Sequence, residues 1–257
     1  ETNTKKYSTE KLIQLNAKEK ISKLIVNLVN DIDNEDESDE LNRVHNTILI
    51  NGKRGMGKTS FILSMKGDKE LMENLCPLKI IDPTLIETKE HVFLNIITSI
   101  KDEVEDFLKC KEDCLEHDSK KNWKKSLHKL AGGLCMLDGV GSNHLNESMW
   151  DSPELILEKG LSNSKQGQDL EKSFHEFIEI SLVLLKKEAF FLILDDIDTA
   201  LDKGISILET LRKYLTSNRL IITMLGDIDL YSILVRQLQW KKIDPNKILK
   251  DYEGTDK

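Results

Sequence analysis

The segment from Gly52 to Thr59 limits what this chain can fold into more than any other part of the sequence. It reads G-K-R-G-M-G-K-T, a complete G-x-x-x-x-G-K-[ST] pattern. The β-rich apolar run at residues 47–50 precedes it, and residues 59–65 have the composition of a helix. The pattern therefore predicts a strand, a glycine-rich turn and a helix in direct succession.

A glycine-rich loop at the start of a helix is suited to binding phosphate groups. Its backbone N–H groups can converge on phosphate oxygens, and the helix dipole favours negative charge at that end. Lys58 would supply a point charge at the β- and γ-phosphates, and the Thr59 hydroxyl can reach Mg²⁺ bound to them. The residues expected to hold the nucleotide are Gly52, Lys53, Arg54, Gly55, Met56, Gly57, Lys58, Thr59 and Ser60.

A second motif follows the apolar run from Phe190 to Leu194, which is expected to be a buried strand. Asp195 and Asp196 come directly after it, so two carboxylates would stand at the tip of that strand. We assign Asp195 to the Mg²⁺ position and Asp196 to the water-activating position. The structural alternative is a strand that simply leaves the core for solvent. Asp198 is expected to be a helix N-cap or a solvated loop acid.

Helices and apolar strands alternate along the chain, which predicts an α/β fold with a parallel sheet covered on both faces. Glycine and serine-asparagine breakers between residues 111 and 168, Gly132 and Gly133 among them, predict an irregular, mostly helical insertion. Further strands are expected at residues 78–81 and 219–225, and helices at 9–29, 88–110, 170–187, 205–215 and 230–240. The expected parts are an N-terminal helix with an acidic linker (1–45), two halves of the nucleotide-binding domain (46–110 and 169–243) around the insertion (111–168), and a polar tail taken as a fragment end (244–257).

The last predicted strand and helix carry two more candidates. If that strand lies between the two motif-bearing strands, Asp227 at its end would face the γ-phosphate as a sensor. Thr223, earlier in the strand, and plain turn chemistry at Asp227 remain alternatives. Arg236 on the next helix is a candidate arginine finger for a neighbouring subunit's nucleotide. A surface arginine is the simpler interpretation, and Arg212 and Arg219 are weaker candidates for the same role.

Composition narrows the function classes. The longest apolar runs are too short to cross a bilayer, so no membrane partner is expected. The 257 residues contain four cysteines, which we interpret as reduced thiols of a cytoplasmic protein. The net charge of −8 gives the whole molecule no long-range attraction for nucleic acid, so any such contact must be local.

Two local clusters of residues have both a functional and a purely structural interpretation. Five lysines lie between residues 120 and 129 around Trp123, and they could contact a nucleic-acid backbone with an aromatic ring to stack. Solvated lysines and a packed tryptophan are the more common arrangement. Cysteine and histidine residues at helical spacing would need one more ligand to hold zinc, and a zinc site is not expected. That set consists of Cys110, Cys114 and His117, with Cys135 or His128 as the additional ligand.

The order of these motifs resembles the AAA+ and STAND branch of P-loop ATPases. Members have a glycine-rich loop, a distant apolar strand ending in two acids, a strand ending in a polar residue, and a helix that bears arginine. The guanine-specific N-K-x-D motif does not occur, since Asn246-Lys247 is followed by Ile248-Leu249, and ATP is therefore expected. More narrowly, residues 194–199, 207–216, 226–232 and 236–240 are similar to the ATPase subunit of the bacterial RADAR anti-phage system.

The resemblance covers residues 46–66 and 170–243, and it implies a parallel-sheet P-loop NTPase of the ASCE type. It further implies a homo-oligomeric ring with ATP and Mg²⁺ at its subunit interfaces, and an adenosine deaminase as the associated effector. Asp196 departs from the family pattern, because AAA+ proteins usually have the longer glutamate there. For this reason a nucleotide-switch scaffold that does not hydrolyse ATP stays open. A separate alternative is an ATP-dependent DNA-binding initiator or remodeller, against which the overall acidity weighs.

Overall fold

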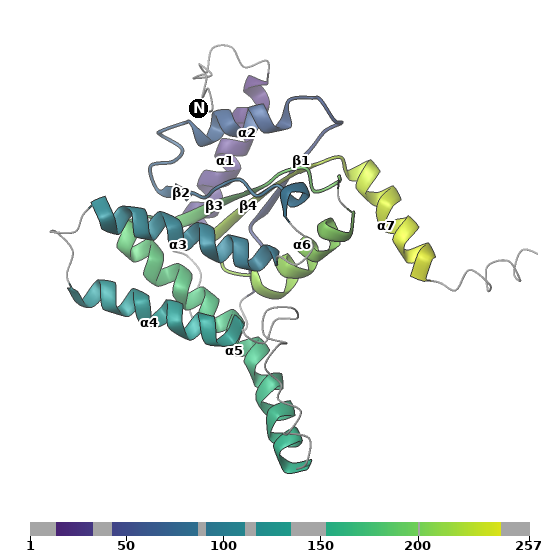
Figure 1. Cartoon of the computed structure of the whole chain (residues 1–257). Helices are drawn as coiled ribbons and strands as arrows, with labels where there is room; N and C mark the ends of the chain where they lie inside the picture. The colour runs from purple at the N-terminus through teal and green to yellow at the C-terminus, as the bar shows by residue number, and fades with distance from the viewer. Residues whose placement is uncertain are drawn as a thin grey trace, which may run out of the picture.

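The computed structural model describes residues 14–32, 43–86, 91–110, 117–134, 153–199 and 201–242. Within these ranges the chain has an α/β fold, with one small parallel sheet surrounded by helices (Figure 1). The strands are β1 (Thr47–Asn51), β2 (Leu75–Pro77), β3 (Ala189–Leu194) and β4 (Leu220–Gly226). The helices are α1 (Leu15–Ile32), α2 (Lys58–Lys66), the 3₁₀ turn η2 (Pro83–Leu85), α3 (Val92–Cys110), α4 (His117–Leu134), α5 (Pro153–Leu185), α6 (Leu201–Tyr214) and α7 (Ile228–Lys242).

The strands lie in the order β1-β4-β3-β2, and every neighbouring pair is parallel. The condition set for Asp227, that the last strand lies between the two motif-bearing strands, is met, because β4 pairs with β1 on one side and with β3 on the other. In a parallel sheet the carboxyl ends of all strands point to the same edge. The segments that follow β1, β3 and β4 therefore leave the sheet next to one another.

Side chains of β3 alternate between two cores, one on each face of the sheet. Phe190, Leu192 and Leu194 belong to the cluster beneath α3, α5 and α6. Phe191 and Ile193 belong to the cluster beneath α1 and α2. All six residues of β3 are buried, as expected for a strand covered on both faces. No helix in the described ranges is long and apolar enough to span a membrane.

The edge strand is displaced from its expected position. A strand was expected at residues 78–81, but β2 is formed by Leu75–Pro77. Beyond it the pairing with β3 is intermittent, through an isolated bridge between Ile81 and Leu194. The amide of Lys79 donates to the Ser99 hydroxyl of α3 at 3.1 Å instead of to a strand. The Ser99 hydroxyl thus takes the place of a backbone acceptor on a neighbouring strand. The pattern of apolar residues in the sequence does not reveal this substitution.

The expected amphipathic helices α1 and α3 are present. Residues 9–13, where α1 was expected to begin, lie outside the described residues. On α1, Ile25 lies on the apolar face that the helical spacing predicts and is buried, whereas Leu24, expected on the same face, is half exposed. Val29, which was not expected there, is also buried. On α3 the expected apolar stripe is buried in the core, and Phe93 stacks on Tyr214 of α6 with ring centroids 4.8 Å apart. Helices expected near residues 205–215 and 230–240 are confirmed as α6 and α7.

The region expected to be irregular contains regular helices wherever the structure describes it. Helix α4 runs through Gly132 and Gly133, and α5 begins inside the expected insertion. A Cβ on Gly133 would lie 2.9 Å from Cδ1 of Leu170 on α5. A side chain at this position would displace the flexible end of Leu170, so glycine favours close approach of the two helices, and α4 continues through it instead of breaking there. Residues 111–116 and 135–152, the rest of this region, and the polar tail at 244–257 lie outside the described residues.

Candidate functional site

The residues predicted to carry chemistry come together at the carboxyl edge of the sheet. The glycine-rich loop follows β1, Asp195 and Asp196 follow β3, and Asp227 follows β4. The amide of Gly52 donates to the Gly226 carbonyl oxygen at 3.1 Å, which ties the start of the loop to the end of β4. Ligands of open α/β sheets bind in the crevice at this edge.

Two glycines give the loop its shape. Gly55 and Gly57 have φ angles of 82° and 80°, in the left-handed region that other residues enter only at a cost. A Cβ at either position would meet nothing within 4 Å, so backbone conformation and not space requires glycine. Gly57 is also the N-cap of α2, and no side chain caps that helix. The first amides of α2 therefore face the loop without a side-chain acceptor.

Lys58, the first residue of α2, folds back over the loop. Its Nζ donates to the Gly52 carbonyl oxygen at 2.6 Å and lies 3.3 Å from that of Lys53. Its charge is thus held at the mouth of the loop by partners that are neutral. The remaining side chains expected to line the nucleotide site are all exposed to solvent: Lys53, Arg54, Met56, Thr59 and Ser60.

The two carboxylates after β3 differ in their environments. Asp195 is 7% exposed, and its amide continues the sheet by donating to the Ile81 carbonyl oxygen at 2.9 Å. Its Oδ1 accepts the amide of Asp196 at 2.9 Å. Asp196 has a positive φ of 47°, which is strained for a residue other than glycine and is tolerated best by aspartate and asparagine. This turn directs the chain away from the sheet immediately after the acid pair.

Charge at this edge is unevenly balanced. Partial burial is the main cause that raises the pKa of Asp196, and the neighbouring carboxylates of Asp195, Asp198 and Asp82 raise it further. The ammonium of Lys58 acts in the opposite direction and lowers the same pKa. The two predicted motifs therefore share one electrostatic environment, in which carboxylates outnumber the nearby ammonium group.

Asp227, the favoured sensor candidate, caps a helix. Its Oδ1 accepts the amides of Asp229 at 3.1 Å and Leu230 at 3.3 Å, in the first turn of α7. The turn chemistry that was kept as an alternative is thus present at this residue. Thr223 lies deeper, fully buried in β4, and its Oγ1 has no hydrogen-bond partner among the described residues. Of the two candidates, Asp227 is the one at the carboxyl edge.

Sequence reasoning missed two residues that connect these segments. Asp198 is 5% exposed, and its Oδ2 accepts the amide of Asp227 at 3.2 Å, so it is neither a solvated acid nor a cap of its own helix. Asn51, the last residue of β1, accepts the amide of Ile228 on its Oδ1 at 3.1 Å. The two side chains fix the start of α7 to the ends of β3 and β1. The spacing D-D-x-D was the only signal of this role in the sequence.

The arginine candidates lie in different places. Arg236 is exposed on α7, a helix that stands away from the body of the molecule (Figure 1). Ile233 and Trp240, three residues before and four residues after it, are 52% and 57% exposed on the same helix. Arg212 is exposed on α6. Arg219 donates to a backbone carbonyl oxygen just before β3, at the opposite edge of the sheet, so the structure does not bring it to the loop.

The structure also describes parts of the lysine cluster around Trp123 and of the cysteine and histidine set. Trp123 is 2% exposed, and its Nε1 donates to the Ser181 hydroxyl at 3.0 Å, so it is packed and cannot stack on a base. Cys110 is an exposed free thiol, whereas Cys114, Cys135 and the side chain of His117 lie outside the described residues. Among the residues that the structure describes, no group of three or more histidine, cysteine or acidic side chains is arranged to hold a metal ion.

No protein-family model matches the chain, and no curated protein matches it.

Proposed function

We propose that this chain is the nucleotide-binding module of a P-loop ATPase of the ASCE type, similar to AAA+ and STAND proteins, which binds ATP with Mg²⁺ and hydrolyses its terminal phosphoanhydride bond. One observation carries the proposal. The glycine loop at the uncapped start of α2 and the acid pair after β3 lie at the same sheet edge, and Lys58 acts on the pKa of Asp196. The position of β4 between β1 and β3 supports the same assignment.

Phosphate binding follows from the loop. With Gly55 and Gly57 in left-handed conformations, the chain turns tightly enough to begin a helix whose first amides have no side-chain acceptor. Such amides and the helix dipole favour an anion. Lys58 adds a positive charge, and phosphate oxygens would replace the carbonyl partners that its Nζ now has.

The donor set at this edge fits Mg²⁺. Burial is the main cause of the raised pKa of Asp196, and the additional effect of three neighbouring carboxylates marks a concentration of carboxylate oxygens, the ligands that hard cations prefer. Asp195 and the hydroxyl of Thr59 would hold the ion together with phosphate oxygens. When bound, Mg²⁺ would neutralise charge on the β- and γ-phosphates.

Asp196 is the candidate for orienting and deprotonating the attacking water. A carboxylate with a raised pKa accepts a proton more readily, which suits a general base. Its side chain is shorter by one methylene than the glutamate usual in AAA+ proteins. For this reason a slow nucleotide switch remains the second candidate, and the observation that favours it is the strained, compact turn in which Asp196 is held.

The proposed assembly is a homo-oligomeric ring. Helix α7 carries Arg236 together with the exposed apolar side chains of Ile233 and Trp240, a combination suited to contact with a neighbouring subunit. Arg236 would then act on that neighbour's nucleotide, while Asp227 would couple the nucleotide to the start of α7. The resemblance described above adds a further proposal, that the ring regulates an adenosine deaminase in anti-phage defence in the cytoplasm.

Binding and turnover must be measured separately to test the proposal. ATP affinity, with and without Mg²⁺, is measured by calorimetry, and phosphate release is followed at rising protein concentration. We expect Lys58→Ala to abolish both, and Asp196→Asn to retain ATP binding while losing turnover. Unchanged affinity in Lys58→Ala would overturn the site assignment. Tight binding without turnover in the wild-type protein would favour the switch.

A further inference from the structure

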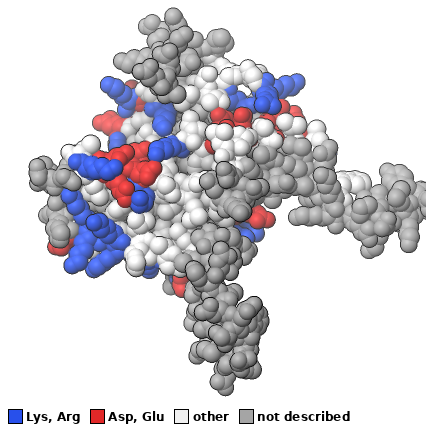
Figure 2. Space-filling view, viewed as in Figure 1, with Lys and Arg blue, Asp and Glu red and all other residues white. Residues whose placement is uncertain are grey.

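The outer surface of α4 is the most strongly charged feature that the proposed ATPase chemistry does not use. Five lysines and one histidine occur within ten residues of this helix, and Asp118 is the one acid among residues 117–134. Figure 2 shows the lysines as a blue group over α4. We call this set the α4 basic surface: Lys120, Lys121, Lys124, Lys125, His128 and Lys129.

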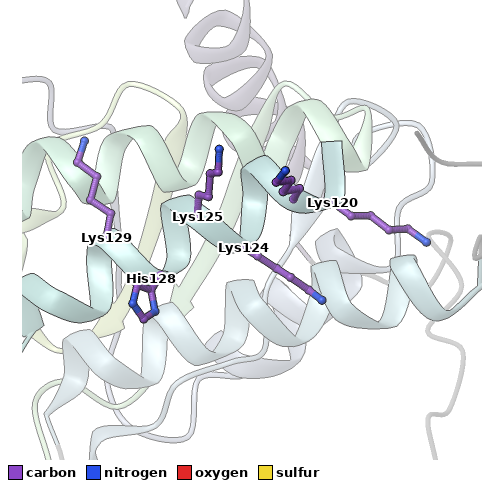
Figure 3. A pocket seen from close by; sticks show the side chains of 6 residues that line it. Lys120, Lys124, Lys125, His128 and Lys129 are labelled. Carbon is purple, nitrogen blue, oxygen red and sulfur yellow. The ribbon is translucent and has the colours of Figure 1, made fainter. Parts of the chain in front are cut away.

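The α4 basic surface lines an open hollow of about 820 Å³. Figure 3 shows that the side chains spread over a broad arc of the helix, with Lys125 and Lys129 pointing to one side and Lys124 and His128 to the other. Lys121 and Lys125, like Lys120 and Lys124, are four residues apart and so lie on neighbouring turns. The surface thus presents rows of positive charge along the helix and not a single binding point.

Like charges at this spacing destabilise a helix. One member, Lys129, is compensated by an ion pair with Glu176 of α5. Glu179 lies in the adjacent hollow between α4 and α5, beside Lys125 and Lys129. Lys121 and Lys124 are exposed and have no ion pair within the described residues, so an external anion would relieve their repulsion. The protein as a whole is acidic, with a net charge of −8, which makes this surface a local exception.

We propose that the α4 basic surface binds the phosphate backbone of a nucleic-acid duplex without reading its base sequence. The buried face of α4 is already occupied by α5, and no large apolar side chain is exposed among residues 117–134. An apolar protein contact and insertion into a membrane therefore lack the required surface. Trp123 is buried, so stacking on unpaired bases is also excluded on this helix.

The binding mode left to the α4 basic surface is electrostatic attraction. Flexible lysine side chains suit this mode, because the phosphates of a duplex are closely spaced. Lys129 comes nine positions after Lys120, a rise of about 14 Å along the helix, enough to face several phosphates. The surface lies on the outer side of α4, which packs against α5 and not against the glycine loop (Figure 1). It is therefore separate from the proposed ATP site and does not depend on that assignment.

The test uses the full chain and a fluorescein-labelled 20-base-pair DNA duplex of arbitrary sequence, followed by fluorescence anisotropy at 50 and 200 mM salt. With about four phosphate contacts, affinity should fall on the order of a hundredfold between the two salt concentrations. Lys121→Ala/Lys124→Ala/Lys125→Ala should weaken binding at low salt roughly tenfold or more and reduce the salt slope by about three. A second duplex of unrelated sequence should bind equally.

Matched variants separate this proposal from its competitors. Replacing the same three lysines by arginine keeps the charge and should keep the affinity, and Lys20→Ala/Lys23→Ala on α1 should leave it unchanged. Alanine favours helix and removes like-charge repulsion, so circular dichroism should show α4 intact. Absence of duplex binding at 50 mM salt, a preference for one sequence, or binding of anionic phospholipid vesicles but not of duplex would overturn the proposal.

Discussion

The amide of Asp227 donates to Oδ2 of Asp198 at 3.2 Å and thereby joins the segments that follow β4 and β3. Asp198 comes two residues after Asp196, the second carboxylate that follows β3. Asp227 caps α7. A displacement of the loop after β3 would therefore be transmitted to the start of α7 through one hydrogen bond. This connection gives the proposed nucleotide site a direct route to the helix that carries Arg236.

Removal of the Asp198 carboxylate should loosen this connection. Asp198→Ala leaves the Asp227 amide without its acceptor, and a hydrogen bond to a charged group contributes about 1.5–3 kcal/mol. Asp198→Asn keeps an acceptor oxygen of similar size and should cost less. Urea unfolding of both variants measures the difference. A free energy of unfolding for Asp198→Ala that equals the wild-type value would show that the connection contributes nothing to stability.

Glycine should be required at position 57 for its backbone conformation. Gly57→Ala must place a Cβ at φ 80°, which costs about 1–2 kcal/mol, although nothing lies within 4 Å of that atom. Gly132 is the matched control, because it lies inside α4 and a Cβ there also meets nothing within 4 Å. Gly132→Ala should stabilise the protein by about 0.5–1 kcal/mol. Thermal melts that moved in the same direction for both variants would contradict this account.

The sequence was sufficient to locate the two motifs at the carboxyl edge of the sheet. The glycine-loop pattern follows one short strand, and Asp195 and Asp196 follow a fully apolar strand. Because the carboxyl ends of parallel strands lie at one edge of a sheet, the two motifs are predicted to lie at that edge. These two features are local or periodic, so they can be read without knowledge of long-range contacts. The position of β4 between β1 and β3 entered the sequence argument only as a condition, and the parallel pairing of β4 with both strands fulfils it.

Features that depend on contacts between distant elements could not be read in this way. Gly133 resembles a helix breaker until Leu170 is known to approach it, and Asp198 resembles a loop acid until the Asp227 amide is known to face it. The same holds for Lys79, whose amide is bound by Ser99 of α3. In each case a residue common in loops is used where two elements meet.

The raised pKa of Asp196 leads to a prediction for the dependence of stability on pH. A carboxyl group whose pKa is higher in the folded state binds its proton more tightly there, so ionisation destabilises the fold as pH rises above the ordinary pKa of an aspartate. Asp196→Asn removes this penalty and tolerates the positive φ equally well. Its melting temperature should exceed that of the wild type at pH 7, and the difference should vanish at acid pH.

An exposed acid with the opposite shift provides the control. The pKa of Asp106 is lowered by its hydrogen bond to Lys109, so its ionised form favours the folded state. Asp106→Asn should therefore leave stability at pH 7 unchanged or slightly reduced. A decrease in melting temperature for Asp196→Asn at pH 7 would mean that the carboxylate is stabilised in the fold, contrary to its crowding by other acids. Such a result would also weaken its assignment as a general base.

The two described cysteines should differ sharply in reactivity. Burial raises the pKa of the Cys76 thiol on β2 to about 12, whereas Cys110 is exposed at the end of α3. At pH 8 only about one Cys76 in ten thousand would be ionised, and the thiolate is the species that reacts. Iodoacetamide should therefore label Cys110 and spare Cys76 until denaturant is added, as peptide-level mass spectrometry can show. Equal labelling without denaturant would mean that β2 opens from the sheet on the timescale of the reaction, and the edge that positions Ile81 against Asp195 could not then be a fixed part of the proposed site.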